Sequence, residues 1–162
     1  MFTEGLNQEQ KRAVETLAGP VLILAGAGSG KTKTLTHRIA NLLAHGVNER
    51  EILAVTFTNK AAREMRERLW NLLYPERFDE VPREFMPYMG TFHSICVKIL
   101  RIESEAAGLG KNFVIYDMDD QVALIKRAFK ELGIDDKYLK PKAVQSIISS
   151  CKNSGETADS YE

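Results

Sequence analysis

The chain has 162 residues, of which 44% are hydrophobic and 27% charged, a composition typical of a globular protein rather than a disordered one. Its formal net charge is zero, which excludes a globally basic nucleic-acid-binding protein and leaves only local clusters to contact nucleic acid. Two distant cysteines exclude a disulfide scaffold, and the absence of any apolar run near ~18 residues or of a signal peptide predicts a cytoplasmic protein without membrane contact.

The first predicted element is a helix that begins after Asn7. Asn7 and Gln10, three residues later, form the pattern of a capping box, in which each side chain bonds the other residue's backbone. The apolar positions that follow are Ala13, Val14 and Leu17. The Gly19-Pro20 pair is expected to end the helix.

Residues 25–32 read Ala-Gly-Ala-Gly-Ser-Gly-Lys-Thr, the pattern of a phosphate-binding loop. A short apolar run at residues 21–24 predicts a strand before it, and helical periodicity predicts a helix after it to about Ala44. Glycines let backbone N–H groups approach an anion, Lys31 can reach terminal phosphates, and the Thr32 hydroxyl can bind Mg²⁺. This strand–loop–helix context disfavours an incidental glycine-rich turn, although Ala25 replaces the usual first glycine.

Two further strand–helix pairs follow. Strands are predicted at residues 52–57 and 88–92, with helices from about 60 to 73 and from about 93 to 107. Residues 74–87 contain three prolines and several charges, which predicts an exposed connection. The alternation predicts an α/β fold with a parallel sheet covered by helices on both faces.

The character of the chain changes from about residue 111 onward. Asp117 is predicted to cap a helix that ends at Gly133, and Pro141 begins another that runs to about Lys152. Residues 113–117 also resemble a strand that ends in a metal-binding Asp, but Met118 follows in place of an acid, so the cap is favoured. These helices predict a second, helical subdomain.

Four stretches together resemble the opening motifs of the UvrD/Rep/PcrA helicases of superfamily one. The stretches are residues 6–10, 25–32, 54–65 and 90–94, in the order and spacing of that family. The Thr-Phe-Thr-Asn-Lys-Ala-Ala segment is close to a family signature, and an initial alanine in the phosphate loop is normal there. The resemblance covers essentially residues 6–152.

This resemblance implies the N-terminal part of an ATP-dependent DNA helicase, with ATP and Mg²⁺ as cofactors. Residues 1–110 would form part of a RecA-like motor domain (1A), residues 111–152 the start of a helical accessory subdomain (1B), and residues 153–162 a polar tail. The whole enzyme would move 3′ to 5′ on single-stranded DNA, unwind junctions with duplex, and use a second motor domain. Because no strand ending in Asp-Glu is present, we expect part of a longer protein, inactive as an ATPase by itself.

The resemblance also assigns the nucleotide site. Its residues are Gln10, Ala25, Gly26, Ala27, Gly28, Ser29, Gly30, Lys31, Thr32 and Lys33. Lys31 and Thr32 would serve catalysis, with Thr32 also on the Mg²⁺ of ATP. From residue type alone Gln10 is favoured as a helix cap, whereas the resemblance has its amide read the adenine edge; the two roles are compatible.

A second set of residues is implied along single-stranded DNA. These are Thr56, Phe57, Thr58, Asn59, Lys60, Thr91, Phe92 and His93. Phe57 could stack on an unpaired base or be buried at a strand end, and His93 could instead cap or pack its helix. The charges between Lys60 and Arg68 are expected to form a solvated helix face with local ion pairs.

Two other classes of function remain open from the residues alone. One is a different P-loop enzyme, such as a small-molecule kinase, which would need an acceptor-substrate lid and an acidic site. The other is a non-catalytic nucleic-acid-binding module, which would leave the phosphate loop without a role.

Overall fold

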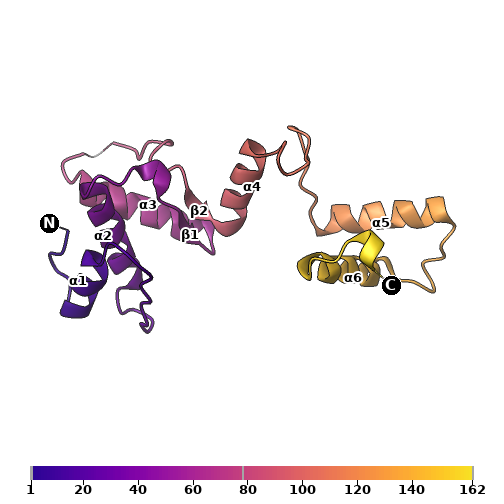
Figure 1. Cartoon of the computed structure of the whole chain (residues 1–162), viewed down its shortest axis with the longest axis horizontal. Coiled ribbons are helices and arrows are strands. Elements are labelled where there is room, and N and C mark those ends of the chain that lie inside the picture. The colour runs from indigo at the N-terminus through magenta and orange to yellow at the C-terminus, as the bar shows by residue number, and fades with distance from the viewer. Residues whose placement is uncertain (1, 78, 162) are drawn as a thin grey trace. The chain divides into compact units, whose positions relative to one another are not determined.

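A computed structural model describes residues 2–77 and 79–161, which divide into two compact units, Met1–Gly108 and Leu109–Glu162 (Figure 1). The first unit contains α1 (Gln8–Glu15), α2 (Lys31–Ala44), β1 (Ala54–Thr56), α3 (Asn59–Leu73), β2 (Met89–Thr91) and α4 (Phe92–Ile102). The second contains α5 (Met118–Leu132) and α6 (Pro141–Asn153). Short 3₁₀ helices lie at Glu49–Glu51 and Ala158–Ser160. Met1, Phe78 and Glu162, which fall in the predicted motor domain, connection and tail, lie outside the described residues.

The sheet consists of β1 and β2, which pair in parallel as the strand–helix alternation predicted. Ala54 lies opposite Met89 and Thr56 opposite Thr91, so the carboxyl ends of both strands are level. Both α3 and α4 contact the two strands. The strands are shorter than the predicted ranges 52–57 and 88–92 because only three residues of each are paired.

The strand predicted at residues 21–24 is wrong. This run has no strand structure, and the side chains of Leu22 and Leu24 are 82% and 87% exposed. A strand requires a neighbour to take up its backbone N–H and C=O groups. Among the described residues β1 and β2 bond each other, and no strand lies beside this run.

Two helices end earlier than predicted. α1 stops at Glu15, because Thr16 is extended and its hydroxyl bonds the Arg12 carbonyl; Leu17 is therefore outside the helix and 40% exposed. The helix predicted to about residue 107 ends at Ile102 and continues as hydrogen-bonded turns to Gly108, whose φ is positive. In both cases the helical spacing of apolar residues continues in the sequence beyond the last residue of the helix, whereas the helical pattern of backbone hydrogen bonds ends there.

The connection at residues 74–87 is not exposed throughout, contrary to the prediction. Phe85 and Met86 are buried at its end, where the Phe85 ring meets the Trp70 ring edge-on with centroids 5.1 Å apart. Prolines remove backbone donors but do not prevent neighbouring side chains from entering a core. The buried core of this unit is formed by Ile39, Ala40, Ile52, Ala54, Met65, Leu69, Trp70, Phe85, Met86 and Met89.

The second unit is built on the packing of α5 against α6. The predicted cap of α5 is confirmed: Asp117 accepts hydrogen bonds from the backbone N–H groups of Asp119 and Asp120, and Gly133 ends the helix in the left-handed conformation. Residues 113–116 are not a strand, in agreement with this assignment. Across the described part of the chain, no helix has the length and apolar character needed to cross a membrane.

Replacing Met86 by Ala should destabilise the first unit by about 2–5 kcal/mol, because the side chain is fully buried and its removal leaves a cavity. Denaturant unfolding followed by tryptophan fluorescence measures this, since Trp70 lies in the same core. Met118→Ala is the matched control, because Met118 is 63% exposed and should cost little. Equal stability of the two variants would show that the 74–87 connection does not contribute to the core.

Candidate functional site

The glycine loop leads into the start of α2, where backbone N–H groups can bind a ligand. Gly28 and Gly30 have φ of 75° and 86°, a region that favours glycine, and Gly30 is the N-cap residue of α2. No side chain caps this helix, whereas α1, α3, α4 and α5 are capped by Asn7, Thr58, Thr91 and Asp117. The first-turn N–H groups and the positive end of the helix dipole therefore suit an anion such as phosphate.

Lys31 lies folded over the loop. Its Nζ atom donates to the carbonyl oxygens of Ala25 at 2.7 Å and Gly26 at 2.5 Å, and the Ser29 hydroxyl donates to Gly26 at 2.7 Å. Backbone carbonyls of the loop thus hold the Lys31 ammonium group, although the Lys31 side chain remains exposed. An incoming phosphate would replace these neutral carbonyl acceptors with anionic oxygens, which bind an ammonium group more strongly.

The exposed Thr32 lies next to Lys31 in the first turn of α2, where its hydroxyl can face a bound phosphate and its metal. Within the described residues, no group of three His, Cys, Asp or Glu side chains could hold a metal. A Mg²⁺ ion here would therefore depend on oxygens of the nucleotide and water, with one protein hydroxyl, as this small cation accepts. The donor set fits Mg²⁺ bound with a nucleotide.

Gln10 connects α1 to the loop. The predicted capping box is confirmed: Asn7 Oδ1 accepts from the Gln10 backbone N–H at 2.9 Å, and Gln10 Oε1 accepts from the Asn7 N–H at 3.0 Å. Gln10 Nε2 also donates to the Ser29 carbonyl at 3.0 Å. An amide has two N–H groups and two acceptor positions, so capacity remains for a ligand edge beside these bonds.

A cavity of about 350 Å³ lies between α1 and the loop. It is lined by Asn7, Glu9, Gln10, Ala13, Leu22, Ile23, Leu24, Ala25, Ser29, Lys31 and Thr34. The structure thus places Gln10 and Lys31 at the lining of one cavity, with polar groups at the loop and apolar side chains from residues 22–24. Lys33 points elsewhere and donates from Nζ to the Gly5 carbonyl at 2.7 Å.

The second group of residues lies at the carboxyl ends of β1 and β2. Phe57 follows β1 and is fully exposed, and Phe92 follows β2 and is 63% exposed, so burial of Phe57 in the core is excluded. The level strand ends place both phenylalanines at the same edge of the sheet. Exposed rings on neighbouring strand ends can stack on unpaired bases irrespective of sequence.

The polar residues of this edge are tied into the starts of α3 and α4. The Thr58 hydroxyl accepts from Ala61 N–H at 3.1 Å, and the Thr91 hydroxyl accepts from Ser94 N–H at 3.2 Å, so both are N-caps. The Thr56 hydroxyl donates to the Thr58 carbonyl at 3.1 Å. The remaining predicted residues here, Asn59, Lys60 and His93, are exposed.

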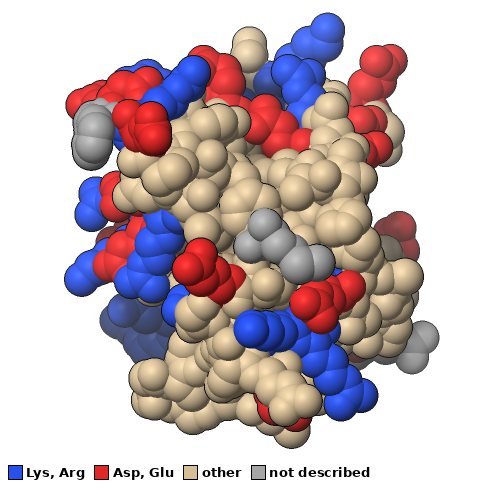
Figure 2. Space-filling view, turned by 90° about the vertical axis from the view of Figure 1, so that its left-hand side faces the viewer, with Lys and Arg blue, Asp and Glu red and all other residues tan. Residues whose placement is uncertain are grey.

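Charge is not concentrated at this edge. Lys60 lies 4.0 Å from Glu64, and the predicted local pairs along α3 continue with Arg63–Glu67 and Arg68–Glu64. Lys98 in α4 donates to the Pro87 carbonyl at 2.8 Å and lies over the Tyr88 ring. On the face drawn in Figure 2, basic and acidic side chains are interspersed around a large uncharged area.

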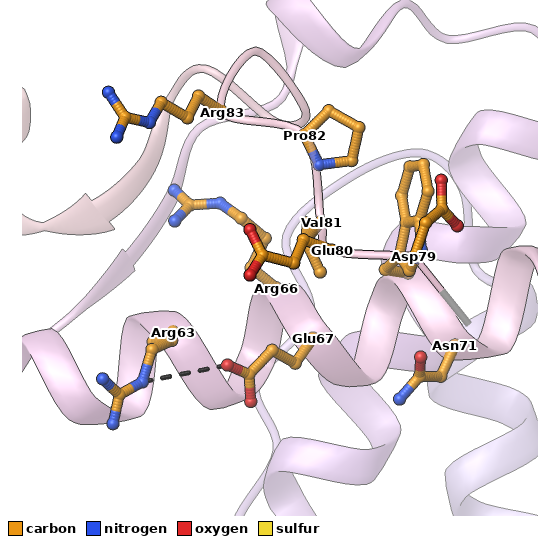
Figure 3. Close-up of a pocket in the computed structure, with 10 residues that line it drawn as sticks. Arg63, Arg66, Glu67, Asn71, Asp79, Glu80, Val81, Pro82 and Arg83 are labelled. Carbon is orange, nitrogen blue, oxygen red and sulfur yellow. Dashed lines mark ion pairs between the residues drawn. The ribbon is translucent and has the colours of Figure 1, made fainter. Parts of the chain in front are cut away.

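A second hollow, of about 530 Å³, was not predicted from the sequence (Figure 3). It lies between α3 and residues 79–83, and Figure 3 shows the Arg63–Glu67 pair on one side and Asp79, Glu80 and Arg83 on the other. Acids and bases are balanced in its lining, which does not select an anion. Arg66, which also lines it, donates to the carbonyl of Met89 and so fixes the first residue of β2.

Comparison of the sequence with known protein families points in the same direction as the geometry of the site. Residues 6–162 match the UvrD/REP helicase N-terminal domain, so the chain belongs to that family. It is 49% identical over 153 residues to the ATP-dependent DNA helicase PcrA of Leuconostoc citreum, covering 94% of this chain and 20% of that protein. The PcrA of Bacillus subtilis strain 168 is 49% identical over 150 residues (92% and 19%), and that of Staphylococcus aureus strain Mu50 is 48% identical over 153 residues (94% and 20%). The chain spans about a fifth of the length of these relatives.

Gly30→Ala should distort the loop, because a Cβ atom would lie 2.8 Å from Gln10 Nε2 and the residue has a φ of 86°. The left-handed conformation alone should cost about 1–2 kcal/mol of unfolding free energy. Gly110→Ala is the matched control, since its Cβ would meet nothing within 4 Å. Thermal unfolding compares the two variants. If Gly30→Ala is as stable as the control, the contact between Gln10 and the loop is not maintained.

Proposed function

We propose that this chain is the ATP-binding portion of a DNA helicase motor. The observation that carries the proposal is the uncapped start of α2, reached through a loop with two glycines at positive φ and overlaid by Lys31. This is the arrangement expected of a triphosphate cradle, and membership of a helicase family supports the same function. The partial sheet would belong to a RecA-like motor domain covering residues 1–110.

ATP would bind with Lys31 on its terminal phosphates, loop N–H groups around them, and the Gln10 amide on the adenine edge. Thr32 would hold the Mg²⁺, which neutralises charge on the phosphates when bound. The 350 Å³ cavity that contains Gln10 and Lys31 supports this assignment, because both ends of one nucleotide would meet it. The Gln10 amide would accept from adenine N6 and donate to N7, which favours adenine over guanine because guanine has an O6 acceptor in place of the N6 donor.

Single-stranded DNA would cross the carboxyl edge of the sheet. Phe57 would stack on a base, Phe92 and His93 would lie farther along the strand, and Thr56, Thr58, Asn59, Lys60 and Thr91 would bond its backbone. The exposure of both phenylalanines at level strand ends supports this track. ATP hydrolysis would then drive 3′ to 5′ movement along the strand and opening of junctions with duplex DNA.

Residues 111–152 would begin a helical accessory subdomain, and a second motor domain would complete the ATPase site. Hydrolysis requires carboxylates that hold the metal and orient water, and cationic side chains that stabilise the transferred charge. In this sequence no apolar strand ends in Asp-Glu, and Asp117 serves as a helix cap. Residues 1–162 would therefore bind nucleotide without turning it over.

Lys31→Ala should weaken binding of Mg·ATP by about tenfold to a hundredfold, because it removes a charge-assisted contact to phosphate oxygens. Titration calorimetry of the intact protein measures the dissociation constant. Lys142→Ala, an exposed lysine of α6, is the matched control and should bind ATP normally. Unchanged ATP affinity in Lys31→Ala would contradict the assignment of the loop.

Phe57→Ala should weaken binding of single-stranded oligonucleotides by about 1–3 kcal/mol with little dependence on base sequence. Fluorescence anisotropy with labelled oligonucleotides of several sequences measures this. Tyr138→Ala removes an aromatic side chain that is 91% exposed in the second unit and serves as the control. A Phe57→Ala protein with wild-type DNA affinity would remove the basis for the stacking track.

A further inference from the structure

α2 is unusual in burying polar side chains. Thr34, Thr36, His37 and Asn41 are all at most 9% exposed. The hydroxyls of Thr34 and Thr36 bond carbonyls of the preceding turn, at Gly30 and Thr32. The other buried polar groups find their partners in the N-terminal segment that contains α1.

Two side chains of α2 hold the end of α1. Arg38 Nη1 donates to the Ala13 carbonyl at 2.6 Å and also to the Thr16 carbonyl. Asn41 Nδ2 donates to the Val14 carbonyl at 3.1 Å in a buried hydrogen bond. The last carbonyls of a helix have no partner within it, and a cation beside them also complements the helix dipole.

The segment before α1 is held by the same helix. Lys33 Nζ donates to the Gly5 carbonyl at 2.7 Å, and His37 Nδ1 lies 2.9 Å from the Phe2 carbonyl. Because a carbonyl can only accept, His37 Nδ1 carries the proton in this bond. α2 therefore contacts the N-terminal segment on both sides of α1.

α1 has eight residues, and a helix of this length is not stable alone in water. Its position thus depends on its packing against α2. Ala13, which Arg38 holds, is three residues from Gln10 and lies on the same face of the helix. Gln10 in turn reaches the loop through its 3.0 Å bond to the Ser29 carbonyl.

We propose that Arg38 is a positioning residue that sets base selectivity at the nucleotide site. It holds α1 at the distance from which the Gln10 amide meets both the loop and the adenine edge. Its bonds to Ala13 and Thr16 go to α1 and its C-cap residue and not to residues 25–32, so it should affect recognition of the base and leave the phosphate contacts intact. This inference rests on the proposed function, because it assumes that the loop binds ATP.

The test measures binding of ATP, GTP and inorganic tripolyphosphate, each with Mg²⁺, to the intact protein by calorimetry. Arg38→Gln should weaken ATP binding by about tenfold and bring the ATP and GTP affinities together, as expected for loss of a charge-assisted clamp. Tripolyphosphate affinity should not change. Arg38→Lys should restore part of the ATP preference, because an ammonium also donates to carbonyl oxygens.

Two further variants serve as a control for the substitution and as an alternative to it. Arg127→Gln makes the same substitution in the second unit, where Arg127 Nε pairs with Glu131 at 2.9 Å, and should leave all three ligands unaffected. Asn41→Leu removes only the bond to Val14 and should lower the ATP preference to a smaller degree. It supplies the answer if Arg38→Gln does not fold. Hydrogen exchange should show faster exchange in α1 of both α2 variants, with α2 unchanged.

The outcomes separate the inference from the proposed function. If Arg38→Gln folds and exchanges faster in α1 but keeps the ATP preference, the positioning role is overturned. Parallel loss of ATP, GTP and tripolyphosphate binding would also overturn it, because Arg38 would then support the loop itself. If the unmodified protein binds ATP no better than Lys31→Ala does, the proposed function fails first. With Arg38→Gln unfolded, an unchanged ATP preference in Asn41→Leu overturns the inference.

Discussion

The start of α2 is the feature on which the arrangement of the first unit depends. A helix that begins without a side-chain cap leaves N–H groups unpaired, and here the preceding loop keeps that end open through glycines with positive φ. The rest of α2 compensates for this exposed start by being buried. α1 packs on it from one side, α3 also contacts it, and even its polar residues find buried partners. The helix end that is open to a ligand thus belongs to one of the most buried helices among the described residues.

Parallel pairing has a comparable consequence at the sheet edge. Because β1 and β2 run in the same direction and in level register, the residues that follow them emerge side by side. Each strand leads directly into a helix capped by threonine, which fixes the turn and directs the next side chains outward. Gly90 contributes here, since a Cβ atom at this position would lie 2.7 Å from Ser94 Oγ and require a shift at the start of α4. The exposed phenylalanines result from this backbone geometry.

Local chemistry made much of this predictable from the sequence. The capping box at Asn7 and the N-cap at Asp117 involve residues close in sequence, so residue type and spacing were sufficient. The features that could not be predicted depend on partners that are distant in the sequence. Residues 21–24 have strand composition, but composition does not supply the neighbouring strand. Met86 lies among prolines, and only the fold shows that it is buried. The partners of Arg38 and Lys98 could not be predicted, because both side chains bond backbone carbonyls, which every residue has whatever its type.

The same preference for backbone groups explains how a chain of zero net charge could serve two anionic ligands. Of the cations near the proposed sites, Lys60 lies 4.0 Å from Glu64 and Lys98 donates to the Pro87 carbonyl, so both already have partners within the chain. Helix starts supply positive potential without formal charge, and α2, α3 and α4 each begin at a proposed site. Each Thr cap of α3 and α4 takes up one backbone N–H, while further first-turn N–H groups have no partner within the helix. Such donors act over short distances and in fixed directions. Affinity would therefore depend on the position of the helices, and the side chains that hold those helices in place would influence binding without touching the ligand.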